Sequence, residues 1–351
     1  MRDKLRCGVI GAGGIGLDHL NSLLHCPRAA AVAVAESHPQ RLREATERYH
    51  VPRGYADWRE ILDQPDLDAV TIALPNHLHA PVAIAALQAR KHVLLEKPMA
   101  TNARDAAKIL AAAQKSRRTV MVAQNFRFDA HTQAARALIQ RGDLGEVYHA
   151  RCFWFRQNHI PRIGSWFTQK QFAGGGSTCD LGVHLLDACL HLLDEFKVVS
   201  VSAQTHAKFG PRGRGDGGWG KSEIDLNRTF DVEDQSAAFL RLKSGRSVIL
   251  ETSWAGFHPA AGREFGIDLL GTEAGLSLYP AKLYRNGPNG YETTHLQLPK
   301  PAVTQDRVHH FVHCVLDGKK TLVPPEESLQ IQHTLDALYA SAASGREVRL
   351  K

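Results

Sequence analysis

Residues 5–16 read LRCGVIGAGGIG, a short apolar strand that runs directly into a G-x-G-x-x-G pattern. In this pattern Gly11 permits a tight turn, Gly13 lets the backbone approach a pyrophosphate, and Gly16 lets the next helix pack on the strand. The start of that helix would offer free N–H groups and a positive dipole end to phosphates. A second apolar strand follows and ends in Glu36. An acid about 20 residues after the glycine pattern accepts hydrogen bonds from the hydroxyls of the adenosine ribose. Together these features predict a dinucleotide site, and a tight turn without a ligand is the alternative.

The composition is that of a globular, enzyme-sized protein. Its 351 residues suggest two domains of roughly 150 residues each. The chain has 43 Lys and Arg against 36 Asp and Glu, and its basic residues are scattered, so neither nucleic acid nor a membrane surface is an expected partner. Six dispersed cysteines form no C-x-x-C pair, which argues against a metal site or a disulfide framework. With no leader segment or membrane-length apolar run, we expect a cytoplasmic protein.

Segments with strand and helix patterns alternate in the first third of the chain. This alternation predicts an α/β domain at residues 1–124, built on a parallel, doubly wound sheet. Residues 125–351 show long β patterns with few helices, which predicts an α+β domain with an open, largely antiparallel sheet. The expected strands are residues 5–10, 30–35, 69–74, 92–95, 119–123, 147–155, 198–207, 236–242, 247–254 and 266–270. The expected helices are residues 14–25, 40–49, 57–62, 77–89, 102–115, 130–141 and 325–344.

Polar residues follow two of the predicted parallel strands. Ligands of open α/β sheets bind outside the carboxyl ends of the strands, so Asn76 and His79 can face the cofactor. The next strand ends in Glu96-Lys97-Pro98, and a lysine there could stabilise a developing alkoxide. The alternatives are a helix cap with a surface histidine, and a solvated Glu-Lys pair.

After a run of three glycines, the sequence predicts a helix that begins near Asp180 and ends near Leu193. At 100° per residue one polar stripe results, consisting of Asp180, His184, Asp187 and His191. The other directions are apolar or glycine, so the helix should be buried and its stripe should face a cavity. A histidine one turn from a carboxylate is suited to act as general base toward a hydroxyl. A purely structural Asp–His hydrogen bond is the alternative.

Several motifs in order make the chain similar to the Gfo/Idh/MocA oxidoreductase family. They are Gly11–Gly16, Leu74–His79, Glu96-Lys97-Pro98, residues 124–128 (QNFRF), Gly174–His184 and residues 335–341 (LDALYAS). The resemblance implies a Rossmann domain and an open-sheet domain, with the nicotinamide in the cleft between them. It implies Lys97 as the catalytic lysine and Asp180 with His184 as the D-x-x-x-H pair, with His184 as proton acceptor. It also implies a homodimer or homotetramer formed through the outer face of the second sheet. Leu74 departs from the threonine that many members carry before the proline.

These observations define the expected site. The expected cofactor-binding residues are Gly11, Gly13, Gly14, Ile15, Gly16, Glu36, Ser37, Arg41, Leu74, Asn76, His79, Glu96, Lys97 and Gln124. The expected substrate-binding residues are Lys97, Arg127, Trp166, Asp180 and His184. No metal is expected.

The predicted function is oxidation of a secondary hydroxyl to a ketone, or the reverse, on a sugar, cyclitol or glycoside. The cofactor should be NAD, because Glu36 would repel a 2′-phosphate, although Arg41 and Arg43 leave NADP possible. The alternatives are a glycosidase that uses NAD for transient oxidation and a non-catalytic nucleotide-binding regulator. Specificity should depend on the loops at residues 156–166 and 210–221.

Overall fold

The computed structural model of the protein describes residues 4–220, 222–225, 227–258, 263–288, 290–296 and 306–350. The chain separates into two compact units. The first contains Met1–Ala123, Gly220–Glu223 and Gln305–Leu329, and the second contains Gln124–Trp219, Ile224–Thr304 and Gln330–Lys351. The sequence division near residue 124 therefore lies where the chain first enters the second unit. Assigning all of residues 125–351 to one domain misses the return of Gln305–Leu329 to the first unit.

The first unit contains the predicted parallel sheet, with six strands in the order β3-β2-β1-β4-β5-β6. Its central strands read as nearly continuous apolar runs because both faces of the sheet are covered. The strands are β1 (Leu5–Ile10), β2 (Ala29–Ala35), β3 (Gly54–Tyr55), β4 (Ala69–Ile72), β5 (His92–Leu95) and β6 (Val120–Val122). The doubly wound fold predicted for this part of the chain is confirmed.

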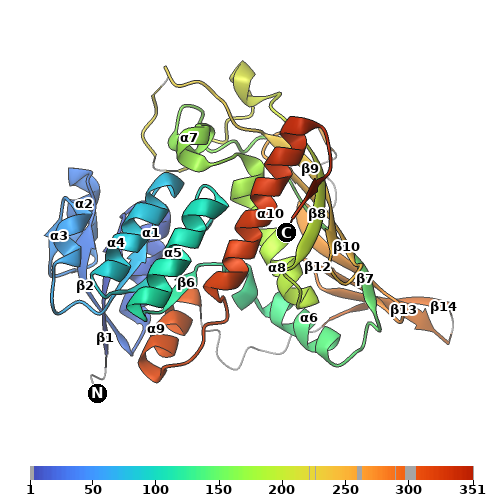
Figure 1. The fold of residues 1–351 in the computed structure, drawn as a ribbon, viewed down its shortest axis with the longest axis horizontal. Coiled ribbons are helices and arrows are strands. Elements are labelled where there is room, and N and C mark those ends of the chain that lie inside the picture. The colour runs from blue at the N-terminus through green and yellow to red at the C-terminus, as the bar shows by residue number, and fades with distance from the viewer. Residues whose placement is uncertain are drawn as a thin grey trace. The chain divides into compact units, whose positions relative to one another are not determined.

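Helices connect these strands (Figure 1), and an added helix comes from the late segment. The helices are α1 (Gly14–His25), α2 (Pro39–Arg48), α3 (Trp58–Leu62), α4 (His79–Gln88), α5 (Ala103–Ser116) and α9 (Arg307–Asp317). Asn102 caps α5 by accepting a 2.9 Å hydrogen bond from the Asp105 N–H. The sequence analysis does not identify α9, which is joined to the first unit by a 2.7 Å ion pair between Arg28 and Asp317.

The second unit is built on a nine-stranded sheet in the order β14-β13-β12-β11-β7-β10-β9-β8-β15. Only β7 and β10 pair in parallel among the described strands, so the sheet is largely antiparallel, as predicted. The strands are β7 (Val147–Phe155), β8 (Val198–His206), β9 (Gln235–Leu242), β10 (Ser247–Ser253), β11 (Phe265–Gly271), β12 (Gly275–Leu278), β13 (Lys282–Gly287), β14 (Gly290–His295) and β15 (Val348–Arg349). The sequence analysis does not identify β12 to β15.

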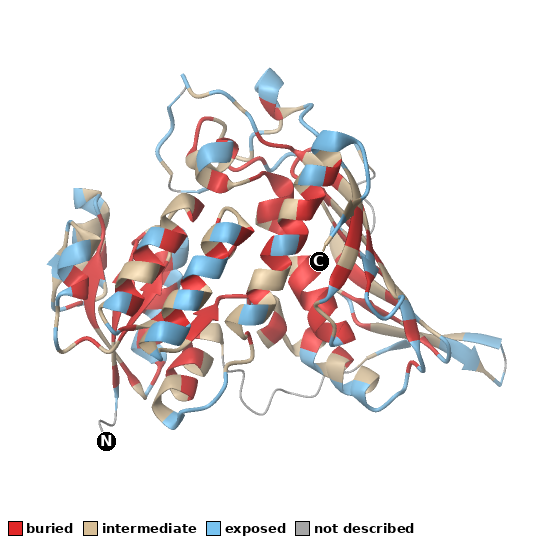
Figure 2. Ribbon diagram, in the orientation of Figure 1, coloured by how far each residue is buried: buried red, intermediate tan, exposed pale blue. Residues whose placement is uncertain are grey.

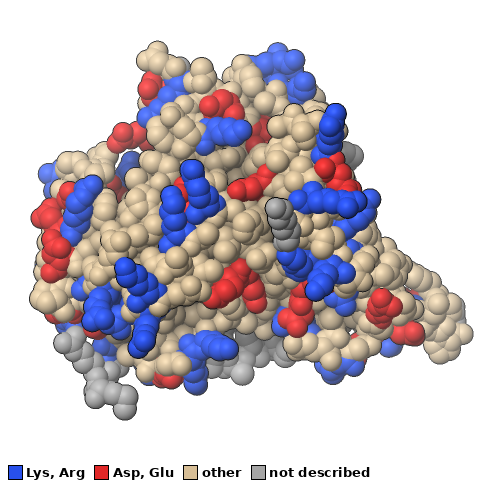
Figure 3. All heavy atoms as spheres, viewed as in Figure 1, with Lys and Arg blue, Asp and Glu red and all other residues tan. Residues whose placement is uncertain are grey.

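Helices cover one face of this sheet (Figure 1). They are α6 (Ala130–Gln140), α8 (Val183–Leu193) and α10 (Pro325–Ser344), most of which belongs to the second unit. The short helix α7 (Lys170–Ala173) lies between β7 and α8 in the chain. Figure 2 shows that α8 is buried along almost its whole length. Figure 3 shows positive and negative side chains interspersed on the face in view. Among the described helices, none is both long enough and apolar enough to cross a membrane.

Candidate active site

The glycine turn of the first unit has the shape that a dinucleotide requires. Gly11 has φ +93°, and a Cβ there would overlap the carbonyl of Ala73. A Cβ on Gly16 would overlap the carbonyl of Gly11. By contrast, a Cβ on Gly13 or Gly14 would meet nothing within 4 Å, so the turn opens into free space there. No side chain caps the start of α1, which leaves its first N–H groups suited to phosphate oxygens.

Glu36 lies directly against this turn. Its Oε2 accepts a 2.8 Å hydrogen bond from the Ala12 N–H, and its Oε1 accepts a 2.9 Å hydrogen bond from the His38 N–H. Each oxygen retains a lone pair for a ribose hydroxyl. Ser37 is exposed at the next position, and Arg41 lies in the first turn of α2. The turn, the uncapped helix and this carboxylate fit a bound dinucleotide.

His79 is fully buried and connects two strand ends. Its Nδ1 lies 2.7 Å from the carbonyl oxygen of Pro98 and its Nε2 lies 2.9 Å from that of Leu74. Burial lowers the pKa of His79, against the opposing effect of the two carbonyls. With both ring nitrogens in contact with backbone carbonyls, His79 has a structural role here, and its contact with the cofactor stays a prediction. Asn76 is also buried, whereas Leu74 is half-buried.

Glu96 is likewise held by the protein itself. His19 Nε2 lies 2.9 Å from its Oε1, and the guanidinium of Arg307 lies 3.6 Å from the same atom. Burial acts to raise the pKa of Glu96, but the hydrogen bond from His19 and the nearby positive charges lower it to about 2. Its Oε2 accepts a 3.2 Å hydrogen bond from the Lys97 N–H. Glu96 therefore stabilises the strand end that presents the half-buried Lys97, and its predicted contact with the cofactor stays a prediction.

Gln124 follows β6 directly and is only 2% exposed. Its carboxamide oxygen is buried and has no hydrogen-bond partner among the described residues. A buried acceptor without a donor costs about 1–3 kcal/mol. This orphaned oxygen is suited to a ligand that carries an N–H or O–H group, as a nicotinamide cofactor does.

In the second unit, Asp180 and His184 are the two accessible positions of a buried segment. Every other residue from 175 to 193 is buried. The helix begins with a π-helical turn, Thr178–Gly182, and only then becomes α8, so the regular helix expected from near Asp180 starts later. Such wide turns are frequent at functional sites.

A buried ion pair occupies the remainder of the predicted polar stripe. Both Arg127 and Asp187 are fully buried, and the two carboxylate oxygens of Asp187 accept hydrogen bonds of 2.7 and 2.6 Å from the guanidinium. His191 is buried as well, and burial together with nearby arginines lowers its pKa to about 3. Only half of the stripe therefore faces accessible space. Arg127 has a structural role instead of the predicted contact with the substrate, because its side chain has no exposed surface.

Asp180 is oriented by Trp254, which lies directly after β10 and is fully buried. The indole N–H donates a 2.9 Å hydrogen bond to Oδ2 of Asp180. The ring of His184 packs near Phe126 and Trp154, with centroids 5.5 and 6.3 Å away. This arrangement leaves an acid and a base on one accessible patch bordered by aromatic rings.

Glu233 holds the glycine run that precedes Asp180. Its carboxylate accepts 2.9 Å hydrogen bonds from the N–H groups of Gly176 and Thr178 and from the hydroxyl of Tyr339. A Cβ on Gly176 would overlap the Glu233 backbone, and one on Gly175 would overlap the ring of Tyr339. Burial raises the pKa of Glu233, and the two N–H donors act against that shift. The glycines are therefore needed for close packing.

Sequence reasoning did not identify Trp254, Glu233 or Tyr339 as supports of the site. Their partners lie 74, 57 and 106 positions away in the chain, so no local pattern reveals them. Trp166, a predicted substrate contact, is half-buried and stacks on Phe167 with centroids 3.8 Å apart. Within the described ranges, no group of three or more His, Cys, Asp or Glu side chains is placed to hold a metal ion.

The glycine turn with its acid in one unit, and the accessible acid–histidine pair in the other, define the class of nicotinamide-dependent oxidoreductases. Comparison with known proteins agrees with this class. Residues 5–124 match the model of an oxidoreductase family with an NAD-binding Rossmann fold. Residues 132–277 match the GFO/IDH/MocA C-terminal domain. The chain belongs to the Gfo/Idh/MocA family, and its first unit is an NAD-binding Rossmann domain.

Several named relatives of this chain are sugar dehydrogenases. It is 30% identical to D-glucoside 3-dehydrogenase of Escherichia coli (strain K12), over 99% of this chain and 97% of the relative. It is 31% identical to levoglucosan dehydrogenase of Pseudarthrobacter phenanthrenivorans, over 69% of this chain and 65% of the relative. A solved levoglucosan dehydrogenase in complex with NADH and levoglucosan has the same fold, with a TM-score of 0.85 at 24% identity and 99% coverage of both chains. The chain is thus an oxidoreductase whose relatives act on CH–OH groups.

Proposed function

We propose that the protein interconverts a secondary hydroxyl and a ketone on a sugar, cyclitol or glycoside. The observation that carries this proposal is the accessible pair of Asp180 and His184 in an otherwise buried helical segment. The names of the relatives support the substrate class. NAD, when bound, supplies the hydride acceptor.

In this proposal each side chain has one role. His184 takes the proton from the substrate hydroxyl, and Asp180 orients either that imidazole or a neighbouring substrate hydroxyl. Lys97 donates to the oxygen as it becomes a carbonyl, and stabilises it electrostatically. Gln124 accepts a hydrogen bond from the cofactor. Because the base must be neutral, oxidation should speed up as pH rises through the ionisation of His184.

NAD is the proposed cofactor, with NADP as the less favoured one. Glu36 has two oxygens fixed beside the glycine turn, so a 2′-phosphate there would meet a carboxylate at close range. Arg41 and Arg43 belong to α2, which begins three positions after Glu36, and they reduce the repulsion.

We also propose a homodimer or homotetramer that uses the outer face of the second sheet. Helices α6, α8 and α10 pack on the inner face. The outer face carries the half-buried Phe155 and Phe239, and Phe153, which is buried beneath the guanidinium of Arg151. Light scattering of the wild type should show a dimer or tetramer, and Phe239→Lys should shift it toward the monomer.

The proposed reaction is tested by incubating the protein with NAD and a panel of methyl glycosides, aldoses and inositols. Absorbance at 340 nm should rise with at least one of them. Net reduced cofactor supports a dehydrogenase, whereas cleavage of a glycoside without net reduced cofactor indicates a glycosidase. Binding of NAD with no turnover across the panel would contradict the proposal in favour of a regulator.

A further inference from the structure

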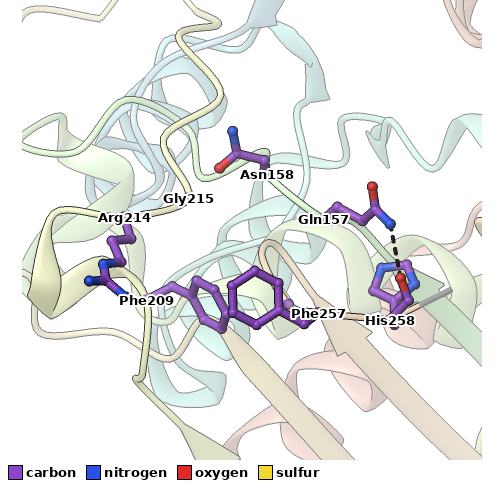
Figure 4. Close-up of a pocket in the computed structure, with 8 residues that line it drawn as sticks. Gln157, Asn158, Phe209, Arg214, Gly215, Phe257 and His258 are labelled. Carbon is purple, nitrogen blue, oxygen red and sulfur yellow. Dashed lines mark hydrogen bonds between the residues drawn. The ribbon is translucent and has the colours of Figure 1, made fainter. Parts of the chain in front are cut away.

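A pocket of about 590 Å³ lies in the second unit (Figure 4), apart from Asp180 and His184. Three chain segments meet there: the end of β7, the loop after β8 and the segment after β10. Two of them fall within the loops from which specificity is expected, residues 156–166 and 210–221. The lining residues are Gln157, Asn158, Phe209, Arg214, Gly215, Gly256, Phe257 and His258.

Backbone hydrogen bonds fix the walls of the pocket. The Ile160 N–H donates to Gly215 at 2.8 Å, and the Gly256 N–H donates to Gln157 at 3.3 Å. On the third side, one carboxylate oxygen of Asp234 accepts from the N–H groups of residues 208, 209 and 210, at 2.7–3.1 Å. The pocket is therefore largely formed before a ligand arrives, which reduces the entropic cost of binding.

The lining combines an aromatic surface with polar groups that have no partner. Phe209 and Phe257 pack edge to face, with centroids 5.3 Å apart, and Phe257 is 96% exposed. Figure 4 shows the two rings together, with Arg214 beside one and His258 beside the other. The side chains of Asn158 and Arg214 are exposed and form no hydrogen bond or ion pair with any described residue. None of the described residues that line the pocket carries a carboxylate.

This pocket is connected to the candidate active site through the chain itself. Trp254, whose indole holds Asp180, lies only two residues before Gly256, so their Cα atoms are at most about 7.6 Å apart. Beneath the pocket, Trp254, Leu181 and Ile160 pack in one apolar cluster, which Phe209 also contacts. The pocket and Asp180 therefore share one supporting cluster, which places them in the same part of the second unit.

We propose that the pocket binds the second, non-reacting sugar ring of a glycoside substrate. An exposed aromatic ring matches the apolar C–H face of a sugar. The carboxamide of Asn158 and the guanidinium of Arg214 can form hydrogen bonds with its hydroxyls. The guanidinium carries a fork of N–H donors that suits two neighbouring oxygens. This inference rests on the proposed function, and it narrows the substrate class to glycosides larger than one ring.

The test compares methyl β-glucopyranoside with cellobiose, and methyl α-glucopyranoside with maltose, in the presence of NAD. Phe257→Ala should raise the ratio of the disaccharide KM to the methyl glycoside KM by about 2- to 10-fold, the range expected for loss of an aromatic contact. Arg214→Gln should raise the same ratio. Tyr291→Ala is the matched control, because Tyr291 is an exposed aromatic residue on β14, outside the pocket, and it should leave the ratio unchanged.

A binding measurement separates this inference from the proposed function. Calorimetry with each disaccharide and the NAD-loaded protein reports on the pocket even if no substrate is turned over. Weaker binding in Phe257→Ala, but not in Tyr291→Ala, supports the pocket. Failure of both disaccharides to bind the wild type would overturn the inference. It would also be overturned if neither pocket variant changed the KM ratio or the affinity for the disaccharides.

Discussion

Replacing Trp254 by Phe removes the indole N–H that orients Asp180 while retaining an aromatic ring in the buried cluster. The bond is 2.9 Å long and ends on a carboxylate, so it belongs to the charge-assisted class worth about 1.5–3 kcal/mol. If all of it were needed in the transition state, kcat/KM would fall about 10- to 150-fold. Asp180 is partly exposed, so water can replace the lost donor in part. We therefore expect a loss of about 10-fold.

The assay must separate orientation of Asp180 from a general loss of packing. Trp254→Phe also leaves a void in the cluster, so its melting temperature should fall. Ile160→Val is the matched control, since Ile160 is fully buried in the same cluster and the change removes one methylene without affecting the hydrogen bond. We expect a lower melting temperature and an unchanged NAD affinity in both variants. Only Trp254→Phe should also show a lower kcat/KM. A kcat/KM for Trp254→Phe within twofold of the wild type would refute the reasoning.

Four further changes test the other assignments. Lys97→Met should keep the fold and the NAD affinity but lose about 10²–10³ in kcat, whereas near-normal turnover would make Lys97 structural. His184→Ala should lose about 10²–10⁴ in kcat/KM and its rise with pH, and a profile unchanged in shape would reject the base. Glu36→Ala should reduce the preference for NAD, measured as the ratio of kcat/KM with NAD to that with NADP. For Glu96→Gln, the folded pKa of about 2 lies below the ordinary 4.5, so the carboxylate stabilises the fold above pH 4.5 and loses this effect as pH falls toward 2. Urea unfolding should therefore show the variant less stable than the wild type by up to about 3 kcal/mol at pH 7, with a gap that narrows below pH 4.5.

The strongly patterned elements could be predicted from the sequence. Strands β1, β5 and β7 and helix α10 begin and end where expected, because a continuous apolar run or a clear period leaves one choice of boundary. The short strands β12 to β15 lack this signal. Their residues alternate weakly, and β13 and β14 are half-exposed or exposed along their length. Pairing with neighbouring strands, rather than local pattern, defines them.

The site could be predicted only in part. The sequence shows which side chains can act as acid or base, but not which residues they pair with in the fold. Asp180 and His184 are accessible as expected, yet the period of 3.6 residues extended the accessible stripe to Asp187 and His191, which are both buried. The π-helical turn changes the geometry at the start of the segment. The carboxylate of Asp187 then finds its charge partner 60 positions earlier, in Arg127, and such a pairing leaves no trace in the local pattern.

Pairing distinguishes the polar residues that support the fold from those that remain for a ligand. Bringing a charge out of water costs several kcal/mol unless a partner compensates, so a fully buried ion needs one within the protein. Arg127 meets this requirement with Asp187. Glu96, whose side chain is 12% exposed, is paired with His19 and lies near Arg307, so neither residue needs a ligand to be stable. The other predicted residues differ in accessibility. Lys97, Asp180 and His184 are not buried, and the buried oxygen of Gln124 has no donor among the described residues. A ligand can reach the first three side chains and can donate to the oxygen of Gln124, and for this reason the proposed chemistry rests on these four residues.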